Sequence, residues 1–237
     1  MKLIISGATG YVAREVIRQS LGRREITSVI ALARKPVPIP QNLEDSADPS
    51  KLKSVIIEDY EQYPEDVVKE FAGAAACIWT VSITPSKSTM YDFEEVKRIC
   101  QASTIAGFKA MHQSGLSKPF RFLYMSGAGS ERDPTKTIRG YKPVYMRMRG
   151  EAEAQALALA NEFGAEFTAV RPGLIMAQGY LLRNIMGIAI PWISGVPSIN
   201  VVDLTAVMLD QVINGFEKDP LLTEDLARLA KDIQDRK

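Results

Sequence analysis

Short apolar runs alternate with amphipathic stretches along this chain of 237 residues, as strands alternate with helices in α/β proteins. The apolar runs predict six strands, at residues 3–5, 28–33, 53–59, 74–82, 121–126 and 165–171. Apolar positions one helical turn apart predict helices just after Gly10 and at residues 62–73, 91–114, 143–163, 201–215 and 225–236. Residues 36–50 are loop-like, so the helix usual after a second strand is missing or very short, while Asp203 and Gly215 are expected to cap their helix. Such alternation predicts a parallel, doubly wound sheet.

The first 17 residues carry the most informative motif, a glycine turn between a strand and a helix. An apolar run at residues 3–5 leads directly into Gly7-x-x-Gly10-x-x-Ala13. Gly7 supplies the positive φ of the turn, Gly10 lets the backbone approach a pyrophosphate, and small Ala13 lets helix and strand pack closely. The helix directs its free N–H groups at the anion, so we expect a Rossmann-type dinucleotide-binding domain rather than an empty crevice. The residues expected around the pyrophosphate are Gly7, Thr9, Gly10, Tyr11 and Val12.

The residues after the second strand indicate which dinucleotide binds. An acidic residue at this position binds the ribose 2′-hydroxyl of NAD, whereas an arginine accommodates the 2′-phosphate of NADP. The chain reads Arg34-Lys35 here, and no acidic residue follows until Glu44. A guanidinium grips a phosphate with two hydrogen bonds and a carboxylate repels it, so we expect NADP(H) as the cofactor. A solvated basic turn is the alternative interpretation.

Four further residues are expected at the cofactor because they follow strands at their carboxyl ends, where ligands bind in such folds. Asp59, with Tyr60 beside it, is placed to meet the adenine, and it also suits the cap of the following helix. Thr80 and Val81, with Ser82, close the fourth strand, and we expect them beside the nicotinamide half, with residues 83–90 forming the rim of the active site.

Three polar side chains are expected to converge at the same edge of the sheet. Ser126 closes the fifth strand, and Tyr145 and Arg149 lie one helical turn apart on one face of helix 143–163. A free tyrosine has a pKa near ~10, so it needs a nearby positive charge to act as a base at neutral pH. Each residue also has a structural interpretation: a surface aromatic for Tyr145, a turn residue for Ser126, and an ion-pair partner of Glu153 for Arg149.

Together these motifs resemble the short-chain dehydrogenase/reductase superfamily, in particular its atypical extended members, which include nucleoside-diphosphate-sugar epimerase-like and NmrA-like proteins. The matching pieces extend from residue 3 to about 215 and are Gly7-Ala-Thr-Gly-Tyr-Val-Ala13, Glu58-Asp59, Tyr124-Met-Ser126, Tyr145-x-x-x-Arg149-Gly-Glu-Ala-Glu153 and Val170-Arg-Pro-Gly173. In that superfamily a tyrosine is the general acid/base, a serine orients the substrate oxygen, and a lysine binds the nicotinamide ribose and lowers the tyrosine pKa. The resemblance implies these roles for Tyr145, Ser126 and Arg149. It also implies that Pro172 and Gly173 present backbone groups to the nicotinamide amide.

The chain departs from the superfamily pattern by having Arg149 in place of the lysine. An arginine keeps its charge and can stabilise a tyrosinate, but it only donates hydrogen bonds and cannot join a proton relay. The function we favour is an NADP-dependent oxidoreductase, of the carbonyl reductase or alcohol dehydrogenase type, acting on a small, largely apolar molecule. The alternatives are an NADP-binding regulatory protein without redox turnover and a cofactor-independent isomerase or epimerase. We expect one domain over residues 1–237, with about 172–200 and 216–237 forming a small substrate lid and a C-terminal extension.

Composition argues against several other classes of protein. The net charge is +1, with 29 basic against 28 acidic residues, so neither nucleic acid nor an anionic membrane is an expected partner. Two cysteines in apolar segments, Cys77 and Cys100, indicate reduced core residues, and one histidine makes a zinc site improbable. The N-terminus is already a strand, which leaves no signal peptide, so we expect a cytoplasmic protein with no metal. The expected partners are a small-molecule substrate and a second copy, since relatives form homodimers through helices equivalent to 91–114 and 143–163.

Overall fold

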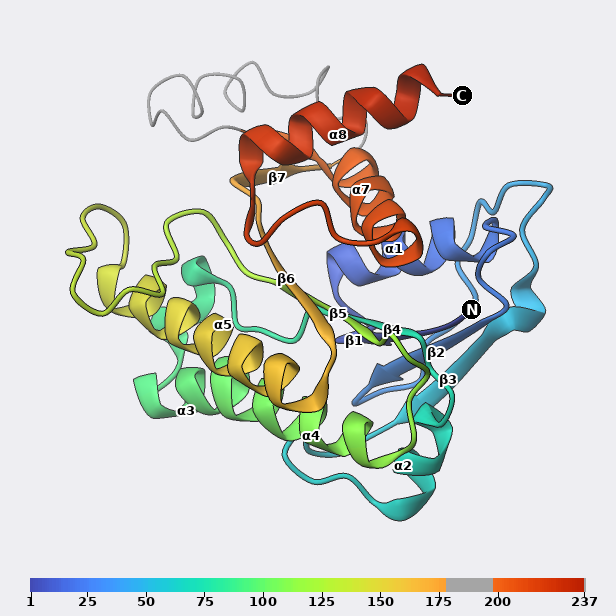
Figure 1. The fold of residues 1–237 in the computed structure, drawn as a ribbon, viewed down its shortest axis with the longest axis horizontal. Helices are drawn as coiled ribbons and strands as arrows, with labels where there is room; N and C mark the ends of the chain where they lie inside the picture. The colour runs from blue at the N-terminus through green and yellow to red at the C-terminus, as the bar shows by residue number, and fades with distance from the viewer. Residues whose placement is uncertain (178–197, 237) are drawn as a thin grey trace.

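A seven-stranded parallel sheet forms the centre of the protein, with the strand order β3-β2-β1-β4-β5-β6-β9. The structure, a computed structural model, describes residues 1–177 and 198–236 (Figure 1). The strands of this sheet are β1 Lys2–Ser6, β2 Ser28–Ala33, β3 Leu52–Ile56, β4 Ala76–Trp79, β5 Arg121–Met125, β6 Glu166–Arg171 and β9 Leu221–Leu222. The order of the first six is that of a doubly wound dinucleotide-binding sheet, which confirms the expected Rossmann-type fold class.

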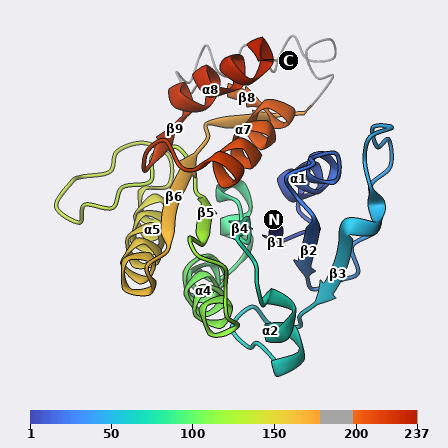
Figure 2. The ribbon, with the colours of Figure 1, turned by 45° about the vertical axis from the view of Figure 1, so that its right-hand side comes forward.

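Helices cover both faces of the sheet and produce three layers, which Figure 2 shows nearly edge-on. One face carries α1 Tyr11–Leu21, α7 Val201–Asn214 and α8 Thr223–Asp235; the other carries α2 Glu65–Phe71, α4 Ser103–Gln113 and α5 Pro143–Phe163. Between β2 and β3 the chain forms only a short 3₁₀ turn, Pro49–Lys51, so the prediction of a missing or very short helix here is confirmed.

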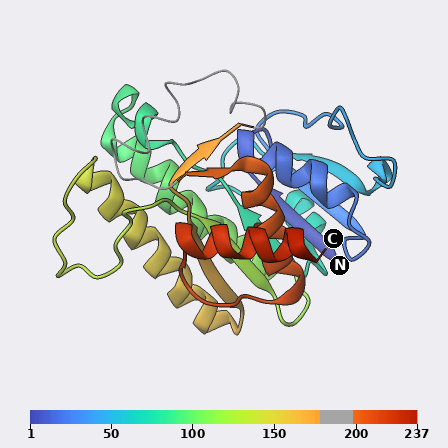
Figure 3. The same cartoon turned by 90° about the horizontal axis from the view of Figure 1, so that it is seen from above.

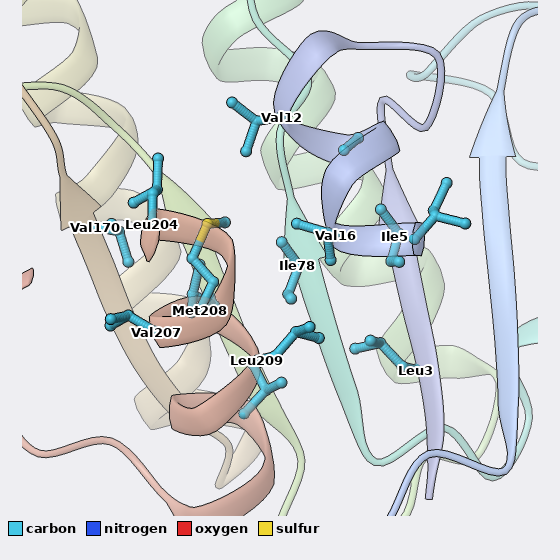
Figure 4. Packing of buried hydrophobic residues seen from close by; sticks show 14 of the residues in the cluster. Leu3, Ile5, Val12, Val16, Ile78, Val170, Leu204, Val207, Met208 and Leu209 are labelled. Atoms are coloured by element: carbon cyan, nitrogen blue, oxygen red, sulfur yellow. The ribbon is translucent and has the colours of Figure 1, made fainter. Parts of the chain in front are cut away.

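The sheet is buried on both faces, because alternate residues of each strand point to opposite layers. Leu3 and Ile5 of β1 pack in the cluster formed with α1 and α7, whereas Ile4 between them belongs to the cluster on the other face. Figure 4 shows Leu3 and Ile5 near Val16 of α1, with Leu209 of α7 in the same cluster. Burial of each such side chain contributes about 1.5–3 kcal/mol. The continuous apolar run at residues 3–5 is therefore what a central parallel strand requires.

The predicted helices differ in detail from the structure. The helix expected over 91–114 consists of α3 Phe93–Lys97, a π-helical turn at Arg98–Ala102, and α4. The prediction that Asp203 caps α7 was wrong: the cap is Asn200, whose side-chain oxygen accepts from the N–H of Val202 at 2.9 Å. A short strand, β8 Ser198–Asn200, runs directly into this helix and places Asn200 at the cap. The predicted end of α7 at Gly215 is confirmed.

The described C-terminal residues belong to the core of the fold. β9 pairs with β6, and α8 packs on α7, where it buries Leu226, Leu229 and Ile233, as the view from above in Figure 3 illustrates. A second, two-stranded sheet joins β8 to β7 Leu174–Met176. The lid expected within residues 172–200 lies mostly in 178–197, outside the described residues. No helix among the described residues is both long and apolar enough to cross a membrane.

Candidate active site

The glycine turn lies where the order of the strands reverses, between β1 and β4. Gly7 adopts a φ of +77°, and a Cβ atom added to it would lie 2.8 Å from Thr80 Oγ1 and 3.1 Å from the backbone N of Val81. Thr80 is held in this position by donating its hydroxyl to the carbonyl of Ser6 at 2.7 Å. The expected cofactor residues Gly7, Thr80 and Val81 are thus brought into contact at the carboxyl ends of two neighbouring strands, where α/β sheets bind ligands.

The amino end of α1 has the donor groups that a pyrophosphate requires. The cap residue Gly10 has no side chain to accept from the helix, and the first turn contains no acidic residue. Among the described residues nothing accepts from the backbone N–H groups of Tyr11, Val12 and Ala13. Unsatisfied N–H groups and the positive end of the helix dipole favour an anion here. This end of α1 therefore fits the diphosphate of a dinucleotide.

Tyr60 supports the glycine turn from inside the protein. Its hydroxyl donates to the carbonyl of Leu32 at 3.1 Å and accepts from the N–H of Gly7 at 3.3 Å. The side chain is only 8% exposed, and burial raises the pKa of Tyr60 to about 12. The sequence indicated Tyr60 as a residue at the cofactor, and the structure places it one layer behind that surface, where its hydroxyl is occupied by backbone groups.

The adenosine end of the expected cofactor site is rich in charge. Arg34 and Lys35 directly follow β2, and both are exposed. Asp59 accepts two hydrogen bonds from Arg98, at 3.2 and 3.3 Å, and one from the N–H of Glu61 at 3.0 Å. Because α2 begins only at residue 65, Asp59 caps this tight turn and not the helix that the sequence analysis paired it with. The aspartate is neutralised by a neighbouring arginine, while Arg34 forms no ion pair within the described residues.

The three candidate catalytic side chains are all buried, Ser126 directly after β5 and Tyr145 and Arg149 on α5. Tyr145 is 6% exposed, Ser126 is 9% exposed and Arg149 is 2% exposed, so Tyr145 is not the surface aromatic of the alternative interpretation. The Tyr145 hydroxyl donates to the carbonyl of Ile83 at 2.8 Å. Arg149 donates to the carbonyl of Met125, and its guanidinium carbon lies 4.6 Å from the centre of the Tyr124 ring.

Arg149 is a buried cation without a carboxylate partner among the described residues. The alternative that it pairs with Glu153 does not hold, because the Glu153 carboxylate accepts from Arg132 at 2.8 Å and from Arg171 at 2.6 Å. One nitrogen of Arg149, Nη1, is buried with no hydrogen-bond partner. The positive charge opposes the effect of burial on Tyr145, but burial is the larger effect and raises the pKa of this phenol to about 12. Tyr145 therefore carries its proton at neutral pH.

The segment that leaves β6 passes close to Ser126. The Ser126 N–H donates to the carbonyl of Val170 at 2.8 Å, and the Ala128 N–H donates to the carbonyl of Pro172 at 2.9 Å. Pro172 and Gly173, expected near the nicotinamide, thus lie beside the loop that carries Ser126.

The structure also adds residues that the sequence analysis missed. Ser130 is 4% exposed, and its Oγ lies 3.0 Å from the Oγ of Ser126. At Gly150 the loop from β5 crosses α5 so closely that a Cβ atom there would lie 1.9 Å from the carbonyl oxygen of Glu131. Arg147 donates to the carbonyls of three residues of this loop. A glycine inside a helix was the signal in the sequence, since helix interiors disfavour glycine unless packing requires it.

Comparison with known proteins agrees with this geometry. The model of the family described as NAD(P)H-binding matches residues 7–212. The chain belongs to this NAD(P)H-binding family. A curated relative, leucinostatins biosynthesis cluster protein T of Purpureocillium lilacinum, is 26% identical over 129 residues, which are 54% of this chain. The chain covers 44% of that relative, less than half of its length.

Solved structures show where this NAD(P)H-binding protein stands by fold. MoeE5 in complex with UDP-glucuronic acid and NAD has a TM-score of 0.65 at 17% identity, covering 99% of this chain and 83% of that chain. DesIV, a dTDP-glucose 4,6-dehydratase from Streptomyces venezuelae with NAD and TYD bound, has a TM-score of 0.67 at 12% identity. The match covers 99% of this chain and 81% of that chain. Vestitone reductase from alfalfa (Medicago sativa L.) has a TM-score of 0.66 at 16% identity. The match covers 93% of this chain and 76% of that chain. These likenesses confirm the expected Rossmann-type fold, and the matched family model confirms that the chain is an NAD(P)H-binding protein.

Proposed function

We propose that this NAD(P)H-binding protein is an NADP-dependent oxidoreductase that reduces a carbonyl, or oxidises the corresponding alcohol, of a small and largely apolar molecule. The observation that supports the proposal is a buried phenol under the influence of a buried cation: the charge of Arg149 acts on Tyr145, and Arg149 donates to the carbonyl of Met125, the residue before Ser126. The glycine turn and its free N–H groups lie two strands away from β5, at β1. A nicotinamide cofactor bound there would supply the hydride.

In this proposal the protein supplies a proton and an oriented hydrogen bond. Tyr145 holds its proton at neutral pH, because burial raises its pKa to about 12, so it suits the role of acid toward a carbonyl oxygen that receives a hydride on its carbon. Ser126 donates to the same oxygen, and the charge of Arg149 stabilises the phenolate that remains on Tyr145. The substrate ends as an alcohol, and the phenol regains a proton from solvent.

The choice of NADP rests on this chain's own charges. Arg34 and Lys35 are exposed at the end of β2, and Arg98 holds the nearby carboxylate of Asp59. Two of the structures similar in fold carry NAD, so they do not support the preference for NADP, which depends on the charges of this chain. The name of the curated relative places it in a biosynthesis cluster, which is in keeping with a small-molecule substrate.

A binding titration tests the cofactor. NADPH and NADH are titrated at fixed moderate salt into the wild type, Arg34→Ala and the control Arg24→Ala, which removes an exposed arginine beyond the far end of α1. Loss of a charge-assisted contact to the phosphate should weaken NADPH by about 1.5–3 kcal/mol, roughly 10–150-fold, and leave NADH nearly unchanged. The same loss in Arg24→Ala, or no binding of either nucleotide at millimolar concentration, would contradict the proposal.

A second candidate, an NADP-binding protein without turnover, is favoured by one specific observation. The Tyr145 hydroxyl donates its proton to the carbonyl of Ile83, and the N–H of Ile83 donates to Cys100 Sγ at 3.3 Å. The phenol proton is therefore already bonded to the protein and not directed at a substrate. Oxidation of NADPH measured with a panel of ketones and aldehydes separates the two functions. Tight binding of NADPH with no turnover of any carbonyl would favour the regulatory protein.

A further inference from the structure

A second serine lies against Ser126 inside the protein. Both hydroxyls are buried, and their Oγ atoms are 3.0 Å apart, a normal distance for a hydrogen bond between hydroxyls. Neither hydroxyl has another hydrogen-bond partner within residues 1–177 and 198–236. With only these two oxygens, one proton joins the pair and the other has no acceptor.

A substrate oxygen supplies the missing acceptor and decides which serine donates to the other. If Ser126 donates to a carbonyl oxygen, its Oγ is left as the acceptor for Ser130, and both protons are used. A hydroxyl that accepts a hydrogen bond becomes a stronger donor, since hydrogen bonds in a chain polarise one another. The chain runs from Ser130 to Ser126 to the substrate.

The loop that carries Ser130 is fixed against α5 at several points. The backbone of Glu131, the next residue, crosses Gly150 at a distance that leaves no room for a Cβ atom. Arg147, on the same helix, donates to the backbone carbonyls of Glu131, Asp133 and Lys136. The position of Ser130 is therefore set by α5, the helix that also carries Tyr145 and Arg149.

We propose that Ser130 is a positioning residue for the reaction: it donates to Ser126 and thereby directs the Ser126 proton at the substrate oxygen. The inference rests on the proposed function, because it acts through Ser126 on a carbonyl substrate. It involves no contact between Ser130 and the substrate itself.

A double-mutant cycle tests this role. Ser130→Ala, Ser126→Ala and the double variant are compared with the wild type in NADPH-dependent carbonyl reduction, with Ser20→Ala as the control because Ser20 is a fully buried serine of α1 that bonds only within its helix. Ser130→Ala should lower kcat roughly 10–100-fold, the scale of losing a group that orients a catalytic residue, with the Kd of NADPH unchanged. In the Ser126→Ala background the same change should lower kcat less than about 2-fold, because its target is already gone.

Two near-isosteric variants separate the hydroxyl from the packing. Ser130→Thr and Ser130→Val add similar bulk, and only the threonine keeps the donor, so threonine should restore kcat at least about 5-fold over valine. Equal losses from Ser130→Ala in both backgrounds, or equal kcat for the threonine and valine variants, would overturn the role. A wild type that turns over no carbonyl removes the proposed function and this role with it, whereas an active enzyme unaffected by Ser130→Ala overturns this role alone.

Discussion

The two halves of the site are built in opposite ways. The cofactor half comes from one continuous stretch, β1, the glycine turn and α1, and it presents backbone N–H groups that have no partner among the described residues. The catalytic half comes from separate segments: Tyr145 reaches Ile83 across 62 residues of chain, and Arg149 reaches Met125 across 24. Its polar side chains are buried: Tyr145 and Arg149 donate to these backbone carbonyls, and Ser126 bonds to Ser130.

The difference shows which physical property each half depends on. An anion site needs exposed donors and a close approach, so it depends on glycine conformation and on the end of a helix. A proton donor at a carbonyl needs a fixed direction, so it depends on buried side chains held by packing and by second hydrogen bonds. A substitution in one half can therefore be judged against the other half as the reference.

Removing the Tyr145 hydroxyl should damage the catalytic half most. Tyr145→Phe should lower kcat of carbonyl reduction about 10²–10⁴-fold, the usual contribution of a positioned proton donor, with NADPH affinity unchanged. Steady-state kinetics and titration check this. Tyr141→Phe is the matched control, since Tyr141 is 62% exposed and lies four residues before Tyr145, outside α5. Turnover retained in Tyr145→Phe would mean that another group supplies the proton.

Adding one methyl group at Gly7 should damage the cofactor half. The new Cβ would meet Thr80, and alanine disfavours a φ of +77°, so Gly7→Ala should lower the free energy of unfolding by about 2–5 kcal/mol and abolish tight NADPH binding. Gly73→Ala is the control, because Gly73 has a φ of +70° with nothing within 4 Å of the added atom. Only the strain of about 1–2 kcal/mol should remain there. Equal effects of the two changes in urea denaturation would show that the close approach to Thr80 is unimportant.

A methyl group at Gly150 should disturb the catalytic half alone. The added Cβ would lie 1.9 Å from a backbone oxygen of Glu131, which no side-chain rotation relieves. Gly150→Ala should cost about 1–3 kcal/mol of stability and displace the loop that carries Ser130, so turnover should fall while NADPH affinity stays. Denaturation and titration measure both, with exposed Glu151→Ala as the control. A variant as stable and active as the wild type would contradict the crossing of loop and helix.

Alkaline pH should affect both halves, because each contains a buried tyrosine. Burial raises the pKa of Tyr60 and of Tyr145 to about 12 in the folded state, against about 10 in the unfolded chain. The stability from each phenol is thus complete below about pH 10 and is lost as pH rises through about 12, at up to about 1.4 kcal/mol per pH unit. Urea denaturation at several pH values in this window should give a shallower decline for Tyr60→Phe and for Tyr145→Phe than for the wild type. Identical slopes would argue against the raised values.

Features that depend on neighbours in the chain were predictable from the sequence. The apolar runs located the six main strands, and β2 and α5 have the predicted bounds. The glycine spacing indicated the turn and the helix that begins after Gly10, because the conformational demand and the residues that meet it lie within one short stretch. Short pairings such as β7 with β8 and β6 with β9 escaped prediction, since two or three residues carry no periodicity.

By itself, the sequence determined the strand–turn–helix unit, the family, and which hydroxyls and charges were candidates for chemistry. Only the tertiary structure decided what those groups touch: that Tyr60 supports the turn from behind, that Glu153 is occupied by two other arginines, and that Ser130 lies against Ser126. The physical reason is that a local motif is specified by backbone conformation and helix ends. A buried polar contact, by contrast, depends on where a segment distant in the sequence crosses. The loop at Glu131, for example, crosses α5 at Gly150, which has no side chain to block it.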